Sequence, residues 1–165
     1  MKRVTSILLA LALLLALAGT AVAEDKGSIT IDNAIVGKKY TIYRIFDLNS
    51  HNTDYSAINY TVSEKWTAFF EKGEPGRTYV DIDETYGYVI WREDAPSAAN
   101  FAAEAMKFAA DKGIAHDGQA VAAPGIVKFD DLALGYYLVQ SDLGELCSLD
   151  TTMPDVTIKE KNSEP

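Results

Sequence analysis

Residues of the types that most often carry out chemistry are sparse in this chain of 165 residues. Its two histidines, His51 and His116, lie in polar stretches without a nucleophile at a recognisable spacing, so both are expected to be solvated surface residues. The motifs Gly-x-Ser-x-Gly, His-Glu-x-x-His and Gly-x-x-x-x-Gly-Lys are absent. The sequence therefore predicts no catalysis, and a small hydrolase that uses one of the histidines ranks last among the hypotheses.

Acidic residues offer one weak candidate for a metal site. The run Asp81-x-Asp83-x-Thr85 resembles the start of a calcium loop, but its sixth position is Tyr86 instead of glycine and its twelfth is Arg92 instead of glutamate. We therefore expect an acidic hairpin tip there and a solvated turn at residues 130–131. Neither a metal nor a cofactor is predicted.

Aromatic side chains are the second group that could hold a ligand, because exposed rings can stack on sugars. The chain has nine tyrosines, six phenylalanines and two tryptophans. Trp91 ends an expected strand, and the adjacent Tyr136 and Tyr137 point to opposite faces of another. Tyr136 and Trp91 are therefore the candidate exposed aromatic contacts.

The first residues predict export. Lys2 and Arg3 precede an apolar run over residues 7–18, and Ala21-Val22-Ala23 is a small-x-small cleavage pattern. This arrangement is typical of a secretory signal peptide at residues 1–23, and the apolar run is too short to be a spanning helix. Removing the peptide takes away two positive charges and leaves 142 residues with a net charge of −11. We expect a secreted protein that is not embedded in a membrane after signal removal.

Charge and length further limit the kind of protein that this chain can be. An acidic chain is a poor partner for nucleic acid, because phosphate contacts need lysine and arginine. Residues 24–160 are enough for one domain with a real core. Cys147 is the single cysteine, so no internal disulfide is possible. It either makes a bridge to another chain or, as we favour, is a small buried side chain between Leu146 and Leu149.

The hydrophobic pattern predicts many short strands with two helices inserted between them. Ser63 is a plausible N-cap of the first helix, whose Trp66, Phe69 and Phe70 face the core. Asp94 caps the second and Gly113 ends it. We read residues 47–54 as a polar loop. The pattern indicates a β-sandwich with α-helical insertions, with strands expected at 27–32, 40–46, 55–62, 78–82, 86–91, 118–123, 125–129, 135–141 and 156–159, and helices at 64–72 and 95–112.

Five stretches, in order along the chain, together resemble the amino-terminal domain of sortase-assembled fimbrial (pilin) subunits of Gram-positive bacteria: residues 27–31, 39–47, 129–139, 146–152 and 156–162. The resemblance implies an immunoglobulin-like sandwich of the Cna protein B type and a structural role in a surface pilus or adhesin. It also implies other pilin subunits and a sortase as partners, and a location at the cell surface or wall. The alternative is a secreted module that binds host glycan or matrix on the same fold.

The same family often carries an internal isopeptide bond from a lysine on the first strand to an asparagine on the last, assisted by a carboxyl group. In this chain the first strand ends in Asp32-Asn33, and residues 137–141 lack the expected glutamate. Asn162 matches the terminal asparagine. Because the other two parts are missing, we predict no isopeptide bond within the domain and treat Asn162 as an unused candidate.

A second family feature is the lysine that a sortase joins to the next subunit. Val156-x-Ile158-x-x-Lys161-Asn162 matches the second half of that motif in spacing, which makes Lys161 the candidate. Thr152 replaces its tryptophan, and Lys159-Glu160 replaces Tyr-Pro. We favour the simpler reading, a final strand that leads into a charged linker over residues 161–165 and a following domain.

Overall fold

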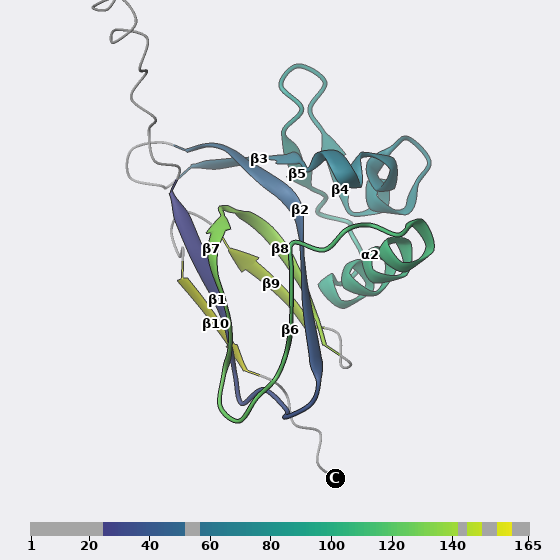
Figure 1. Cartoon of the computed structure of the whole chain (residues 1–165). Helices are drawn as coiled ribbons and strands as arrows, with labels where there is room; N and C mark the ends of the chain where they lie inside the picture. The colour runs from purple at the N-terminus through teal and green to yellow at the C-terminus, as the bar shows by residue number, and fades with distance from the viewer. Residues whose placement is uncertain (1–24, 52–56, 142–144, 150–154, 160–165) are drawn as a thin grey trace, which may run out of the picture.

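The computed structural model describes residues 25–51, 57–141, 145–149 and 155–159, and it is mainly β (Figure 1). In chain order its elements are β1 (Lys26–Asp32), β2 (Lys39–His51), β3 (Ile58–Val62), the 3-10 helices η1 (Glu64–Phe70) and η2 (Pro75–Thr78), β4 (Val80–Ile82), β5 (Val89–Trp91), α2 (Ala98–Lys112), β6 (Gly118–Val121), β7 (Val127–Ala133), β8 (Gly135–Gln140), β9 (Glu145–Leu149) and β10 (Asp155–Lys159).

Two sheets make up most of the fold. The first has the order β10-β1-β7, with β1 parallel to β10 and antiparallel to β7. The second has the order β3-β2-β8-β9, with β6 also paired to β2, and every pairing in it is antiparallel. A separate hairpin of β4 and β5 touches the second sheet through the bridge Thr61↔Tyr88.

The two sheets share one core, which we call the sheet core. Strand alternation explains its composition, because every second side chain of a strand faces the same side. From β8, Tyr137 and Val139 point into the sheet core, while Leu138 points the other way. The sheet core consists of aliphatic side chains with three aromatic rings: Ile29, Ile31, Ala34, Tyr40, Ile42, Ala122, Val127, Phe129, Leu132, Leu134, Tyr137, Val139 and Val156.

The opposite face of the β2–β8 pair is covered by the helices and the hairpin, as the right side of Figure 1 shows. The cluster beneath them, which we call the helical core, is rich in aromatic rings. Its buried members are Ile45, Phe46, Trp66, Phe69, Phe70, Tyr79, Val80, Phe101, Ala102, Ala105, Ala109 and Leu138. The prediction that Trp66, Phe69 and Phe70 face a core is confirmed.

The second helix is confirmed, with a corrected start. Ser97 is its N-cap and accepts the backbone N–H of Asn100, so the helix begins at Ala98. Asp94, the predicted cap, instead pairs with Arg92, whose hydrogen bonds hold the pKa of the Asp94 carboxyl below its usual value. Gly113 ends the helix at φ 64, a left-handed conformation that glycine adopts without strain.

The first predicted helix is shorter and tighter than expected. It is the 3-10 helix η1, which ends at Phe70, and the Ser63 side chain makes no capping hydrogen bond. The Ser63 hydroxyl donates instead to the carboxylate of Asp47 on β2. A side chain consumed by a tertiary contact cannot also cap the backbone beside it.

Three further expectations were wrong. Residues 47–51 belong to β2 and not to a loop, because Ser50 pairs with Asn59 on β3 and accepts its side-chain N–H at 3.2 Å. Asp130 and Asp131 are exposed as expected, but they lie inside β7 instead of in a turn, and Asp131 has a positive φ of 57. Strand β9 was not predicted at all. Among the described residues, no helix has the length and apolarity that a membrane span requires.

Candidate functional site

A hollow of about 530 Å³ interrupts the second sheet beside the middle of β2. Strand β6 pairs with β2 over Lys39–Ile42, and β3 pairs with it from Phe46 to His51 on the same side. Between them, residues 43–45 face no strand there. This charged hollow is lined by Arg44, Asp47, Ser63, Glu64, Lys65 and Asp117.

Two residues take over the hydrogen bonds that a strand would make across this gap. The backbone N–H of Asp117 donates to Ile42 O at 2.8 Å, and its carboxylate accepts the backbone N–H of Arg44 at 2.5 Å. The backbone N–H of Ser63 donates to Ile45 O at 3.0 Å. Ile42 O, the Arg44 N–H and Ile45 O, which face no strand here, therefore have hydrogen-bond partners, as buried or half-buried peptide groups require.

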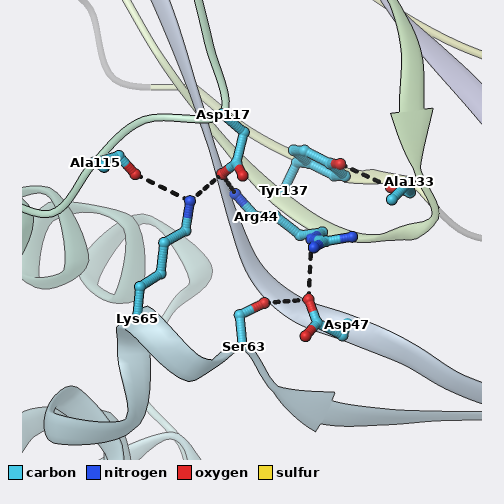
Figure 2. Close-up of polar contacts among 8 residues, drawn as sticks. All are labelled: Arg44, Asp47, Ser63, Lys65, Ala115, Asp117, Ala133 and Tyr137. Atoms are coloured by element: carbon cyan, nitrogen blue, oxygen red, sulfur yellow. Dashed lines mark hydrogen bonds and ion pairs between the residues drawn. The ribbon is translucent and has the colours of Figure 1, made fainter.

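Lys65 connects two parts of the chain at this point, as Figure 2 shows. Its ammonium donates to Ala115 O at 3.0 Å and lies 2.5 Å from the Asp117 carboxylate. The pair is about three-quarters buried, with 28% and 24% of the two side chains exposed. Lys65 thereby joins η1 to the segment that leads from α2 into β6.

Arg44 and Asp47 form the other half of the site. Arg44 Nε lies 2.9 Å from Asp47 Oδ1, an ion pair whose angles fall outside hydrogen-bond geometry. The same carboxylate oxygen accepts the Ser63 hydroxyl (Figure 2). Gly135 leaves the room for this arrangement, since a Cβ there would stand 3.0 Å from Arg44 Cδ. We call Arg44, Asp47, Ser63, Lys65 and Asp117 together the polar latch.

The polar latch joins separate segments of the chain to one another through hydrogen bonds and ion pairs. The carboxylates of Asp47 and Asp117 each face a cation, and both are consumed by partners within the fold. Ser63 donates to the Asp47 carboxylate, which also faces Arg44, and no histidine is among the residues that line the hollow. In the described part of the chain, no group of three or more metal-ligating side chains is present.

The structure brings together the two aromatic residues singled out from the sequence. The rings of Trp91 and Tyr136 lie 5.5 Å apart, and each also contacts Phe46. The Trp91 side chain is 43% exposed, whereas Tyr136 is half-buried. Trp91 is thus the more accessible of the pair, and both rest on the buried helical core.

The remaining candidates lie apart from the polar latch. His116 is exposed in the segment before β6. His51 is the last residue of β2. The Asp83 carboxylate accepts the N–H groups of Thr85 and Tyr86, which makes it a turn-forming residue at the hairpin tip. Lys161 and Asn162 lie outside the described residues. Cys147 belongs to β9, and its side chain is not described.

Sequence reasoning did not find Lys65 or Asp117. The two are 52 residues apart along the chain, and neither is part of a motif. Ser63 was noticed, but as a helix cap. One feature of the sequence could have indicated Asp117, because it lies directly before a short strand. A polar side chain at such a position can accept a backbone N–H that has no partner on a neighbouring strand.

Comparison with models of known protein families gives no match. Comparison with curated proteins gives none either.

Proposed function

We propose that this chain is a structural domain of a surface pilus or adhesin, without catalysis, that contributes subunit contacts in a fibre. One observation carries the proposal. The first and last described strands, β1 and β10, are parallel neighbours in register from Ser28↔Asp155 to Asp32↔Lys159. The chain therefore enters β1 at one end of the molecule and leaves β10 at the opposite end (Figure 1).

This geometry suits a module that carries tension. A pull at the two ends of the domain loads the β1–β10 hydrogen bonds along the strand direction, so that they must fail together. Ser28 adds a side-chain hydrogen bond to Asp155 across the same pair at 2.7 Å. On the inner side β1 is held by β7, with Ile29 and Ile31 buried in the sheet core. Resistance of this kind is governed by the unfolding rate under load.

The same proposal includes a more specific assignment of the fold. Two sheets with a common core and the helical layer outside it support an immunoglobulin-like sandwich of the Cna protein B type. By the same resemblance, we propose other pilin subunits and a sortase as partners, and a location at the cell surface after removal of residues 1–23. If Lys161 is the sortase nucleophile, Lys161→Arg abolishes polymerisation, because arginine keeps the charge without the reactive amine. Retained polymerisation excludes Lys161.

Single-molecule pulling tests the load-bearing role. In residues 24–165 carrying Cys147→Ala, handles at Asp25→Cys and Lys159→Cys load the β1–β10 pair in shear. The matched control moves the second handle to Ala133→Cys, opposite Lys26 at the start of β1, so that the force peels β1 from its antiparallel neighbour β7 at one end. We expect the shear geometry to unfold at several times the force of the control. Equal or lower force in the shear geometry contradicts the proposal.

A second candidate function, binding of a host glycan or matrix, is favoured by the exposure of Trp91 beside Tyr136. Trp66, the other tryptophan, is fully buried, so a ligand on the surface changes the indole signal of Trp91 alone. Titration with a panel of oligosaccharides, followed by fluorescence and by the two indole N–H resonances, tests the idea. Binding is expected to disappear in Trp91→Ala, and a panel without any response counts against this function.

A further inference from the structure

Two tyrosine rings lie face to face at the tip of the β4–β5 hairpin. The centroids of the Tyr86 and Tyr88 rings are 5.4 Å apart and the ring planes are inclined by 20°, which is a stacked arrangement. Tyr86 is 69% exposed and Tyr88 is half-buried. Of the tyrosines that the structure describes, Tyr86 alone is exposed. The hairpin projects at the top of Figure 1, so solvent reaches the pair directly.

The turn of the hairpin holds the backbone on both sides of this tyrosine pair. The Gly87 N–H donates to Asp83 O, and the Asp83 N–H donates to Tyr88 O, both at 2.9 Å. The Asp83 carboxylate also accepts the backbone N–H of Tyr86 at 2.7 Å. Gly87, between the two tyrosines, has a φ of 73, a left-handed conformation that glycine adopts without strain. The β-bridge to Thr61 joins Tyr88 to β3, so the two rings are held near each other before any reaction.

We propose that Tyr86 and Tyr88 form an oxidation site, where hydrogen peroxide, used by a haem peroxidase from outside the chain, joins the two rings by a carbon–carbon bond. Each phenol loses one electron and one proton, and the two radicals couple through the ring carbons beside the hydroxyl groups, the Cε atoms. The hydrogens on these two carbons move to the phenol oxygens, which restores both hydroxyls. One hydrogen peroxide takes up the two electrons and the two protons and becomes two water molecules.

The stacked arrangement directs this reaction into one hairpin and away from neighbouring molecules. Two groups held together in one molecule react as if each were far more concentrated than any dissolved protein. Exposed side chains also change rotamer within nanoseconds, so the two Cε atoms can meet. Charge opposes coupling between copies, because the chain carries a net charge of −9 and residues 83–88 include Asp83 and Glu84 without a basic residue. Arg92 lies on the stem, where it pairs with two aspartates. Tyr88 therefore captures a radical formed on Tyr86.

Treatment of residues 24–165 with a haem peroxidase and one equivalent of hydrogen peroxide tests the site. The parent for this test carries Cys147→Ala, which removes the thiol, and Tyr55→Phe, because Tyr55 lies outside the described residues. We expect a monomer with dityrosine fluorescence. Its tryptic peptide of residues 78–92 should be lighter by two hydrogens, and fragmentation should place the link between Tyr86 and Tyr88. Tyr136→Phe, which removes a half-buried tyrosine outside the hairpin, is the matched control and should react as the parent does.

Removing one ring at a time separates the two roles. Tyr86→Phe should abolish the link, whereas Tyr88→Phe leaves the Tyr86 radical without a neighbour and should raise the yield of covalent dimers severalfold. Both changes retain the ring, so the variants should unfold at the temperature of the parent. Covalent dimers as the main product of the parent, an equal dimer yield in Tyr88→Phe, or no link in the parent while free N-acetyltyrosine is coupled in the same reaction overturns the proposal. The pulling experiment needs neither tyrosine, so its result is independent of this one.

Discussion

The sheet core and the helical core lie on the two faces of the same β2–β8 pair, and they are built differently. The sheet core is mostly aliphatic, and both of its walls are hydrogen-bonded sheets. Half of the buried side chains of the helical core are aromatic, and its outer wall consists of two 3-10 helices, a short hairpin and one α-helix. Strand ladders fix the first layer, whereas ring packing and the polar latch fix the second.

The difference teaches where the fold is open to local unfolding. A wall of separate short elements has few backbone hydrogen bonds to the sheet, so its stability depends mainly on side-chain contacts. The rings supply most of these contacts, as in the edge-to-face pairs of Trp66 with Tyr43 and with Phe69, at 6.1 and 5.8 Å. Lys65 ties η1 to the segment after α2 at one point.

Removal of the Trp66 ring should have the largest effect, and it should destabilise the helical core more than the sheet core. Trp66 is fully buried, so Trp66→Ala should lower the free energy of unfolding by about 4 kcal/mol. Hydrogen exchange should accelerate in α2 and η1 more than in β1 and β8. Thr67→Ala, an exposed change on the same helix, is the control and should cost less than about 0.5 kcal/mol. Equal acceleration in all four elements means that the two cores unfold as one unit.

Gly135, at the start of β8, tests how closely the backbones of β8 and β2 must approach between the two cores. A Cβ at this position would stand 2.3 Å from the backbone oxygen of Phe46, which has no freedom to move away. Gly135→Ala should therefore cost about 2–3 kcal/mol in chemical denaturation. The matched control is Gly118→Ala, whose Cβ would meet only side chains, of Phe129 and Ile42, at 3.0 and 3.2 Å. A cost at Gly135 no larger than at Gly118 contradicts this account.

The polar latch should contribute less than the rings. Asp117→Ala removes the acceptor of the Arg44 N–H and should cost about 2 kcal/mol, whereas Lys65→Met removes only a partly exposed pair and should cost about 0.5–1 kcal/mol. Asp117→Asn retains an acceptor and should lie between the two. Thermal unfolding of the three variants measures the order, and a larger loss in Lys65→Met than in Asp117→Ala would reverse the assigned roles.

The smallest effect concerns Tyr137 in the sheet core. Burial raises the pKa of its phenol well above the ordinary value of 10.0, and its hydroxyl donates to Ala133 O at 2.7 Å. The folded state therefore holds the proton that the unfolded chain releases near pH 10. Stability should be unaffected below that pH and should fall as pH rises above it. Tyr137→Phe should flatten part of this fall in denaturation curves recorded between pH 9 and 11, and an unchanged slope would contradict the assignment.

The sequence predicted the elements well where their signal is local. The alternation in residues 27–32 and 135–141 identified β1 and β8, and sent Tyr136 and Tyr137 to opposite faces as observed. The apolar stripe identified α2, and Gly113 its end. Errors arose where a tertiary contact overrides a local preference. Ser63 bonds to Asp47 instead of capping η1, and pairing with β3 extends β2 to His51.

The sequence by itself therefore determined most of the strands, the long helix and the apolar face of each, because a period of two or of 3.6 residues is written within each segment. Only the tertiary structure decided which strands become neighbours. The parallel pairing of β1 with β10 joins residues 127 positions apart, and the Lys65–Asp117 pair joins residues 52 apart. Such contacts depend on the joint packing of both sheets and the helical layer, and several strands of similar pattern compete for each place, so no local pattern specifies them.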